Sequence, residues 1–112
     1  RHHEHKADAP SGTALRTAEL IAAARSHPVE NPPTTLERVP GARGGEAENI
    51  HVHAVRLPGY VANQEVVFGG RGEVLKIEHV TTGRECFMPG VLLAIRKVRE
   101  LEGLVVGLEQ LM

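Results

Sequence analysis

Residues 63–80 have the sequence NQEVVFGGRGEVLKIEHV, and this stretch decides which fold the chain adopts. Two segments rich in branched apolar residues, 63–68 and 72–80, flank a turn at Gly69-Gly70, a pattern that predicts a β-hairpin. Upstream, residues 50–57 (IHVHAVRL) alternate apolar or small side chains with His and Arg, which predicts a third strand. Three successive strands form most of a sheet.

Helical spacing of apolar residues is found on both sides of these strands. Residues 12–25 (GTALRTAELIAAAR) follow Ser11, a suitable N-cap, and predict a helix. After Pro89, apolar side chains recur at helical spacing over residues 91–101, which predicts a second helix. A short apolar strand is expected at residues 104–106.

The segment 26–48 is rich in proline and glycine, so we expect a long connection without regular structure over most of its length. The resulting order is helix, three strands, helix, strand. It predicts an α+β fold in which a mixed sheet of about four strands carries its helices on one face.

Length and composition limit the classes of function. With 112 residues and 41% hydrophobic content, we expect one domain over residues 1–112. The net charge of −1 and the 3% aromatic content argue against a nucleic-acid partner. No apolar stretch approaches the roughly 20 residues that a membrane-spanning helix needs. The single cysteine, Cys86, cannot form an intrachain disulfide, which favours a reducing compartment such as the cytoplasm.

The residue types that carry chemistry are concentrated in the first thirteen positions, RHHEHKADAPSGT. The start of a helix presents unpaired N–H groups and a partial positive charge, so residues 11–13 (Ser-Gly-Thr) suit a carboxylate or phosphate. Gly12 allows a ligand to approach the backbone. Lys6 adds a full positive charge, and a nearby histidine can transfer a proton near neutral pH.

Other interpretations of this segment remain open on these grounds. The histidines could be part of an expression tag. His2, His3 and His5 could instead bind zinc. Residues 11–13 could form only a helix cap. The chain contains neither a G-x-G-x-x-G nor a Walker sequence, so any nucleotide would be held mainly by residues outside it.

Residues 2–14 (HHEHKADAPSGTA) resemble the signature of the dihydrodipicolinate reductases, also called 4-hydroxy-tetrahydrodipicolinate reductases. That signature is a histidine pair, a lysine three residues later, and then D-A-P-S-G-T-A. Residues 55–59 and 64–69 are similar to the hairpin region of the family. Residues 84–91 resemble its S-R-x-x-F-x-x-G segment, with Gly83 in place of the serine. The likeness spans nearly the whole chain.

The resemblance implies an oxidoreductase that converts 4-hydroxy-tetrahydrodipicolinate to tetrahydrodipicolinate with NADH or NADPH, in lysine and diaminopimelate biosynthesis. This chain would be its C-terminal domain for substrate binding, catalysis and oligomerisation. A Rossmann domain outside the chain would bind the nucleotide, so we expect this domain alone to bind no cofactor and to be inactive. The resemblance further implies a dicarboxylate substrate and a cytoplasmic homotetramer assembled through the sheet.

The resemblance also implies roles for individual residues. The catalytic residues would be His2, as general acid, and Lys6. The substrate-binding residues would be His3, Lys6, Ser11, Gly12 and Thr13. Arg84 and Phe87 would lie near the cofactor, and no metal site is expected. Two alternatives of other classes are an oligomerisation module with a vestigial site and a histidine-based metal-binding domain.

The remaining histidines and the cysteine have simpler expected roles. His51, His53 and His79 are predicted to face solvent or an interface, because they fall within alternating strand patterns. Cys86 is predicted to pack as a small hydrophobic residue near the start of a helix.

Overall fold

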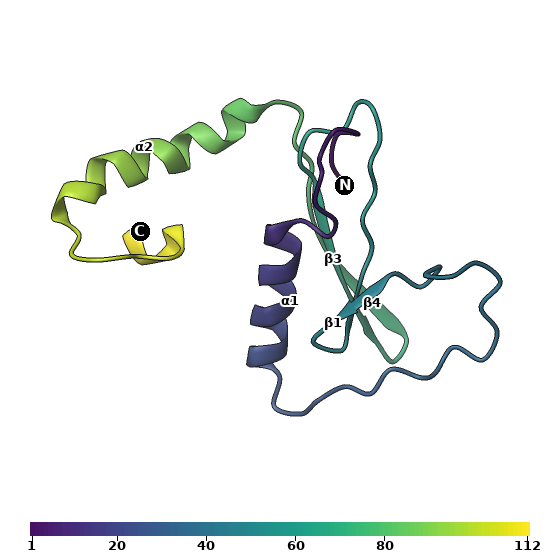
Figure 1. Cartoon of the computed structure of the whole chain (residues 1–112). Helices are drawn as coiled ribbons and strands as arrows, with labels where there is room; N and C mark the ends of the chain where they lie inside the picture. The colour runs from purple at the N-terminus through teal and green to yellow at the C-terminus, as the bar shows by residue number, and fades with distance from the viewer. The chain divides into compact units, whose positions relative to one another are not determined.

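The computed structural model describes residues 1–112 and divides into two units, Arg1–Val80 and Thr81–Met112. The first unit contains α1 and all four β-strands, and the second contains α2 and three short 3-10 helices (Figure 1). None of the helices has the length and apolar character needed to cross a lipid bilayer.

Helix α1 spans Gly12–Ala24, within one residue of the prediction. Ser11 precedes it in an extended conformation, and its Oγ accepts a hydrogen bond from the N–H of Ala14 at 3.3 Å. This cap satisfies one of the N–H groups that have no acceptor within a helix. Ala18 is buried at 3% exposure, so the face of α1 that carries it is the face turned toward the rest of the unit.

Strands β3 (Gln64–Gly70) and β4 (Glu73–His79) form the predicted hairpin, antiparallel from Gln64↔His79 to Gly70↔Glu73. The turn is at Arg71-Gly72, so its prediction at Gly69-Gly70 was wrong by two residues. Both of those glycines continue β3 instead. Gly72 has a φ of 78°, a left-handed conformation that glycine adopts without steric cost, and this places the turn there.

A second hairpin joins β1 (Gly45–Ala47) to β2 (Ile50–Val52) in antiparallel register. Glu48 and Asn49 connect them, and both have positive φ values, 53° and 59°, as a type I′ turn requires. The connection predicted over residues 26–48 has no helix or strand over most of its length, as expected, and β1 forms near its end. The strand predicted over residues 50–57 is real but shorter.

The α+β class is confirmed, but the strands form two separate two-stranded antiparallel sheets and not one mixed sheet of about four strands. His2 forms isolated β-bridges to Arg56 and to Ala62, which add short pairings outside the named strands. The strand predicted at residues 104–106 is absent, because these residues pair with no other strand.

Strand β4 is exposed along its whole length within this chain. Its apolar side chains include Val74, Leu75 and Ile77, which are 59% to 63% exposed. A strand of this length with exposed branched apolar residues is a surface that other chains can cover.

The second unit contains η1 (Arg84–Phe87), α2 (Met88–Lys97), η2 (Val98–Glu100) and η3 (Leu108–Leu111). Pro89 lies in the first turn of α2, as predicted. Cys86 is exposed, so the prediction that it packs as a small hydrophobic residue was wrong.

The position of the β3–β4 turn gives a direct test. Gly72→Ala should lower the free energy of unfolding by about 1–2 kcal/mol, because alanine is strained at this positive φ. Gly69→Ala is the matched control, since its added Cβ would meet no atom within 4 Å and Gly69 does not have a positive φ. Urea unfolding followed by circular dichroism measures both changes. A larger loss for Gly69→Ala would contradict the turn assignment.

Candidate functional site

Backbone hydrogen bonds fix the position of His2. Its N–H donates to the carbonyl of Val55 at 2.9 Å, and its carbonyl accepts from the N–H of Leu57 at 3.1 Å. On the other side, the N–H of Asn63 donates to the carbonyl of Arg1 at 2.8 Å. Residues 1 and 2 therefore lie between two segments that come from the middle of the chain.

The guanidinium of Arg1 adds a second attachment. It pairs with the carboxylates of Glu65 on β3 and Glu78 on β4. The ammonium of Lys76 lies 3.3 Å from Glu65, and Lys76 and Arg1 together hold the pKa of Glu65 below its usual value. The segment that carries His2 is thus tied to the β3–β4 hairpin by charge as well as by its backbone.

The imidazole of His2 is partly buried beside a cavity of about 560 Å³, which Ser11 and Arg56 also line. Its Nδ1 is buried and has no hydrogen-bond partner. Burial lowers the pKa of His2, and the positive charges of Arg56 and Lys6 lower it further. The free site therefore holds a neutral imidazole at neutral pH.

Lys6 lies in the loop between His2 and α1. Its Nζ is 2.6 Å from Oδ1 of Asp8, and its side chain is 25% exposed. The hydrogen bond from Lys6 lowers the pKa of Asp8, so Asp8 stays ionised. An ammonium has three N–H donors, so this pairing leaves donors of Lys6 available to a ligand.

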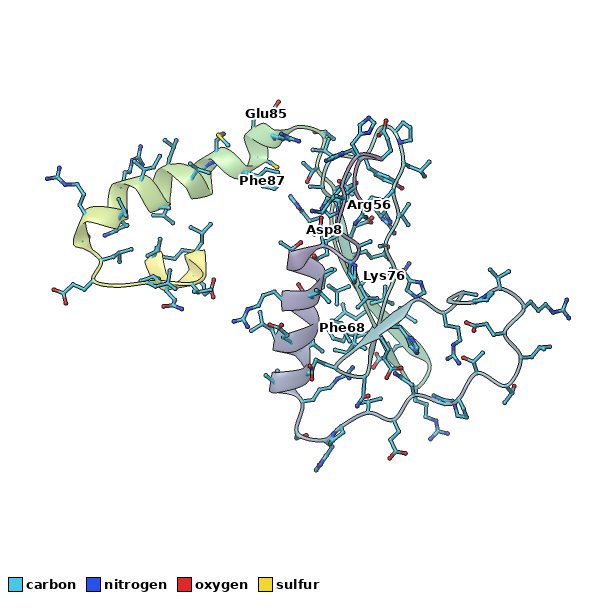
Figure 2. All side chains as sticks on the ribbon, in the orientation of Figure 1. Asp8, Arg56, Phe68, Lys76, Glu85 and Phe87 are labelled. Atoms are coloured by element: carbon cyan, nitrogen blue, oxygen red, sulfur yellow. The ribbon has the colours of Figure 1, made fainter.

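Arg56 contacts the same loop. One of its Nη atoms donates to the carbonyl oxygen of Asp8, and the other donates to the carbonyl of Val55 at 2.9 Å. Figure 2 shows Asp8 next to the first turn of α1, with Arg56 beside it. The loop, the segment around residue 56 and the start of α1 meet at this point.

The start of α1 combines a buried cap with an open turn. Ser11 is buried, and its Oγ lies 3.2 Å from Oγ1 of Thr13. Gly12 and Thr13 are exposed, and a Cβ added to Gly12 would meet no atom within 4 Å. The first turn of the helix is therefore open, and the first N–H groups of a helix are suited to an anion.

Among the predicted site residues, His2 and Ser11 border one cavity, and His3, Lys6, Gly12 and Thr13 do not line it. Lys6 is close enough to His2 to influence its pKa. His3 is partly buried, and its carbonyl accepts from the N–H of Lys6 at 3.3 Å. Arg84 and Phe87 belong to η1 in the second unit, so their proximity to the cofactor stays a prediction.

No three His, Cys, Asp or Glu side chains are arranged to hold a metal ion. A zinc site formed by His2, His3 and His5 therefore has no geometric support.

Sequence reasoning missed three residues at this place. Asp8 and Arg56 lie inside the segments that resemble the family, yet no role was assigned to them. Their contact joins positions 48 residues apart, and no local pattern signals such a contact. His51 was predicted to face solvent or an interface, but both of its ring nitrogens are buried and without partners, and it lines the cavity. His53 and His79 are exposed.

The whole chain, residues 1–112, matches the family described as "Dihydrodipicolinate reductase, C-terminus". The chain belongs to this family. The resemblance first noted in residues 2–14 is confirmed.

Curated relatives carry the name 4-hydroxy-tetrahydrodipicolinate reductase. The protein of Moorella thermoacetica is 59% identical over 111 residues, covering 99% of this chain and 41% of the relative. The protein of Mycobacterium ulcerans is 58% identical over 111 residues, covering 99% of this chain and 45% of the relative. This reductase C-terminal domain thus spans less than half the length of these relatives.

A solved structure supports the same assignment. The dipicolinate-bound dihydrodipicolinate reductase from Paenisporosarcina sp. TG-14 is 43% identical and has a TM-score of 0.83. The match covers 99% of this chain and 42% of that chain. The two proteins are therefore similar in sequence as well as in fold over the length of this chain.

Proposed function

We propose that this chain is the substrate-binding and catalytic domain of a 4-hydroxy-tetrahydrodipicolinate reductase in lysine and diaminopimelate biosynthesis. The observation that carries the proposal is the grouping of His2, Lys6 and the open first turn of α1 in one unit. The names of the relatives that this chain matches along its whole length agree with it.

The site suits a cyclic substrate with two carboxylates. The N–H groups of Gly12 and Thr13 would bind one carboxylate, with Thr13 Oγ1 and Ser11 at the same end. Lys6 would bind the substrate with its ammonium, and His3 would contribute beside it. The charges of the site favour such a ligand. Asp8 neutralises one positive charge by pairing with Lys6, while Arg56 carries a second positive charge and His2 can accept a proton.

The reaction replaces a ring hydroxyl with hydrogen, and the hydroxyl leaves as water. A reduced nicotinamide, when bound, supplies the hydride. His2 would supply the proton that balances the reaction, and Lys6 would offset the charge that develops on the substrate. Because free His2 is neutral, it must gain this proton when the anionic substrate binds.

The cofactor would be held mainly outside this chain. We assign it to a Rossmann domain elsewhere in the protein, since this chain has no glycine-rich phosphate loop. Arg84 and the 41% exposed Phe87 offer a cation and an aromatic ring suited to a nucleotide edge. The domain alone would then bind a dicarboxylate weakly and would not turn over. The proposed hydride donor is NADH or NADPH, and the reducing cytoplasm is the proposed location.

Variants of the ligand-binding groups test the substrate site. In the full-length protein that contains this chain, Lys6→Met should weaken the binding of pyridine-2,6-dicarboxylate about 10–100-fold, because a charged hydrogen bond is lost. Gly12→Ala should weaken it about tenfold or more, since the new methyl group occupies the space over the helix start. Isothermal titration calorimetry measures both, with Gly69→Ala as the matched control. Wild-type affinity in both variants, with unchanged thermal unfolding, would contradict the assignment of Lys6 and Gly12 to the substrate site.

The protonation of His2 gives a second test. Its pKa is depressed in the free protein, and a bound dianion should raise it, so binding should take up a proton. The affinity for pyridine-2,6-dicarboxylate should therefore rise as the pH falls through the interval between the two pKa values. Calorimetry in buffers of different ionisation enthalpy measures the uptake directly. His2→Asn should abolish most of it. Equal uptake in wild type and His2→Asn would exclude His2 as the proton acceptor.

We also propose that the protein is a homotetramer assembled through this domain. The support is β4, whose exposed Val74, Leu75 and Ile77 favour burial against another copy. The same feature favours the alternative of an oligomerisation module with a vestigial site, which would assemble but would not bind the dicarboxylate.

The double variant with Leu75→Asp and Ile77→Asp should yield smaller species than the wild type by light scattering. A wild-type monomer would contradict the assembly.

A further inference from the structure

The guanidinium of Arg56 joins three parts of the site. Its backbone forms a parallel β-bridge with His2, so the residue is fixed beside the proposed acid. One Nη donates to the carbonyl of Val55, the same oxygen that accepts the N–H of His2. The other Nη reaches across the chain to the carbonyl of Asp8.

Asp8 connects Arg56 to Lys6. Its backbone carbonyl receives the hydrogen bond from Arg56, while its carboxylate pairs with Nζ of Lys6 at 2.6 Å. The backbone of Asp8 and the ammonium of Lys6 are therefore held by one continuous series of contacts that starts at Arg56. A loop held at its middle loses little conformational entropy when a ligand binds.

We propose that Arg56 is a positioning residue, which holds the Lys6–Asp8 loop against the His2 segment and so presets the groups that bind the dicarboxylate. This inference rests on the proposed function, because it concerns the same site. Arg56 acts through Asp8 and Lys6, and no contact of its own with the ligand is required.

Two properties of Arg56 can be separated experimentally. Its planar guanidinium donates to two carbonyl oxygens at once, whereas a lysine ammonium at the end of a flexible chain does not reproduce that fork. Its charge lowers the pKa of His2, as does the charge of Lys6. Arg56→Lys keeps the charge and removes the geometry, while Arg56→Gln removes the charge as well.

The test uses four variants of the full-length protein: Arg56→Lys, Arg56→Gln, Lys6→Met and the control Arg71→Gln. Arg71 lies exposed in the β3–β4 turn, so its replacement removes one positive charge away from the loop. Binding of pyridine-2,6-dicarboxylate is measured by calorimetry, and KM and kcat are measured against pH. Circular dichroism melting identifies the variants that fold.

We expect Arg56→Lys to weaken binding and raise KM about tenfold, as for the loss of one charged hydrogen bond, with a smaller change in kcat. Its pH profile should stay that of the wild type. Arg56→Gln should show the same loss of binding, and the pKa assigned to His2 in its pH profile should move up. Arg71→Gln should match the wild type.

Two outcomes overturn the inference, and they are distinguishable. If Arg56→Lys binds the dicarboxylate like wild type while Lys6→Met does not, the positioning role is wrong and the proposed function stands. If Lys6→Met also binds like wild type, the proposed function itself fails. Should Arg56→Gln not fold, Arg56→Lys still decides the positioning role, because it keeps the charge and most of the side-chain volume.

Discussion

The backbone pairing of residues 1 and 2 with residues 55–57 and 63 is the constraint on which the candidate site depends. The hydrogen bonds of His2 with Val55 and Leu57, and of Arg1 with Asn63, place the first residues of the chain inside the first unit. From there the chain passes through Lys6 and Asp8 to the capped start of α1. This pairing fixes the backbone position of the residue that carries the imidazole.

The charges of the site explain its suitability for a dianion. A partly buried imidazole, the Lys6 ammonium and the Arg56 guanidinium lie near the positive end of α1, and Asp8 balances part of this charge. Burial and positive neighbours lower the pKa of His2 and keep the free imidazole neutral, so it can take up a proton together with an anion. In the proposed function, the charges that would favour binding of a dicarboxylate are thus the same ones that would prepare His2 as the acid.

The local signals of the sequence were sufficient for part of the fold. Ser11 and the helical spacing after it defined α1 within one residue, because capping and periodicity are local properties. The turn after β3 was misplaced, because residues 69–72 contain three glycines, at positions 69, 70 and 72. Their spacing alone does not show which of them adopts a positive φ. Strand β1 was missed because it has only three residues and begins at Gly45, directly after Gly44, and such glycines predict a loop. Leu104–Val106 is apolar but has no partner strand.

The candidate site divides in the same way. His2, Lys6 and residues 11–13 were proposed from a contiguous signature, whereas the proposed roles of Arg56 and Asp8 rest on a contact between distant positions. His51 was misassigned because strand alternation does not reveal that α1 and β3 border the cavity it lines.

A crystal structure of the full-length protein with pyridine-2,6-dicarboxylate would test the central claim most directly. The account predicts one ligand carboxylate within hydrogen-bond distance of the N–H groups of Gly12 and Thr13, with Nζ of Lys6 and the ring of His2 contacting the same molecule. A ligand bound elsewhere, with these N–H groups left to solvent, would contradict it.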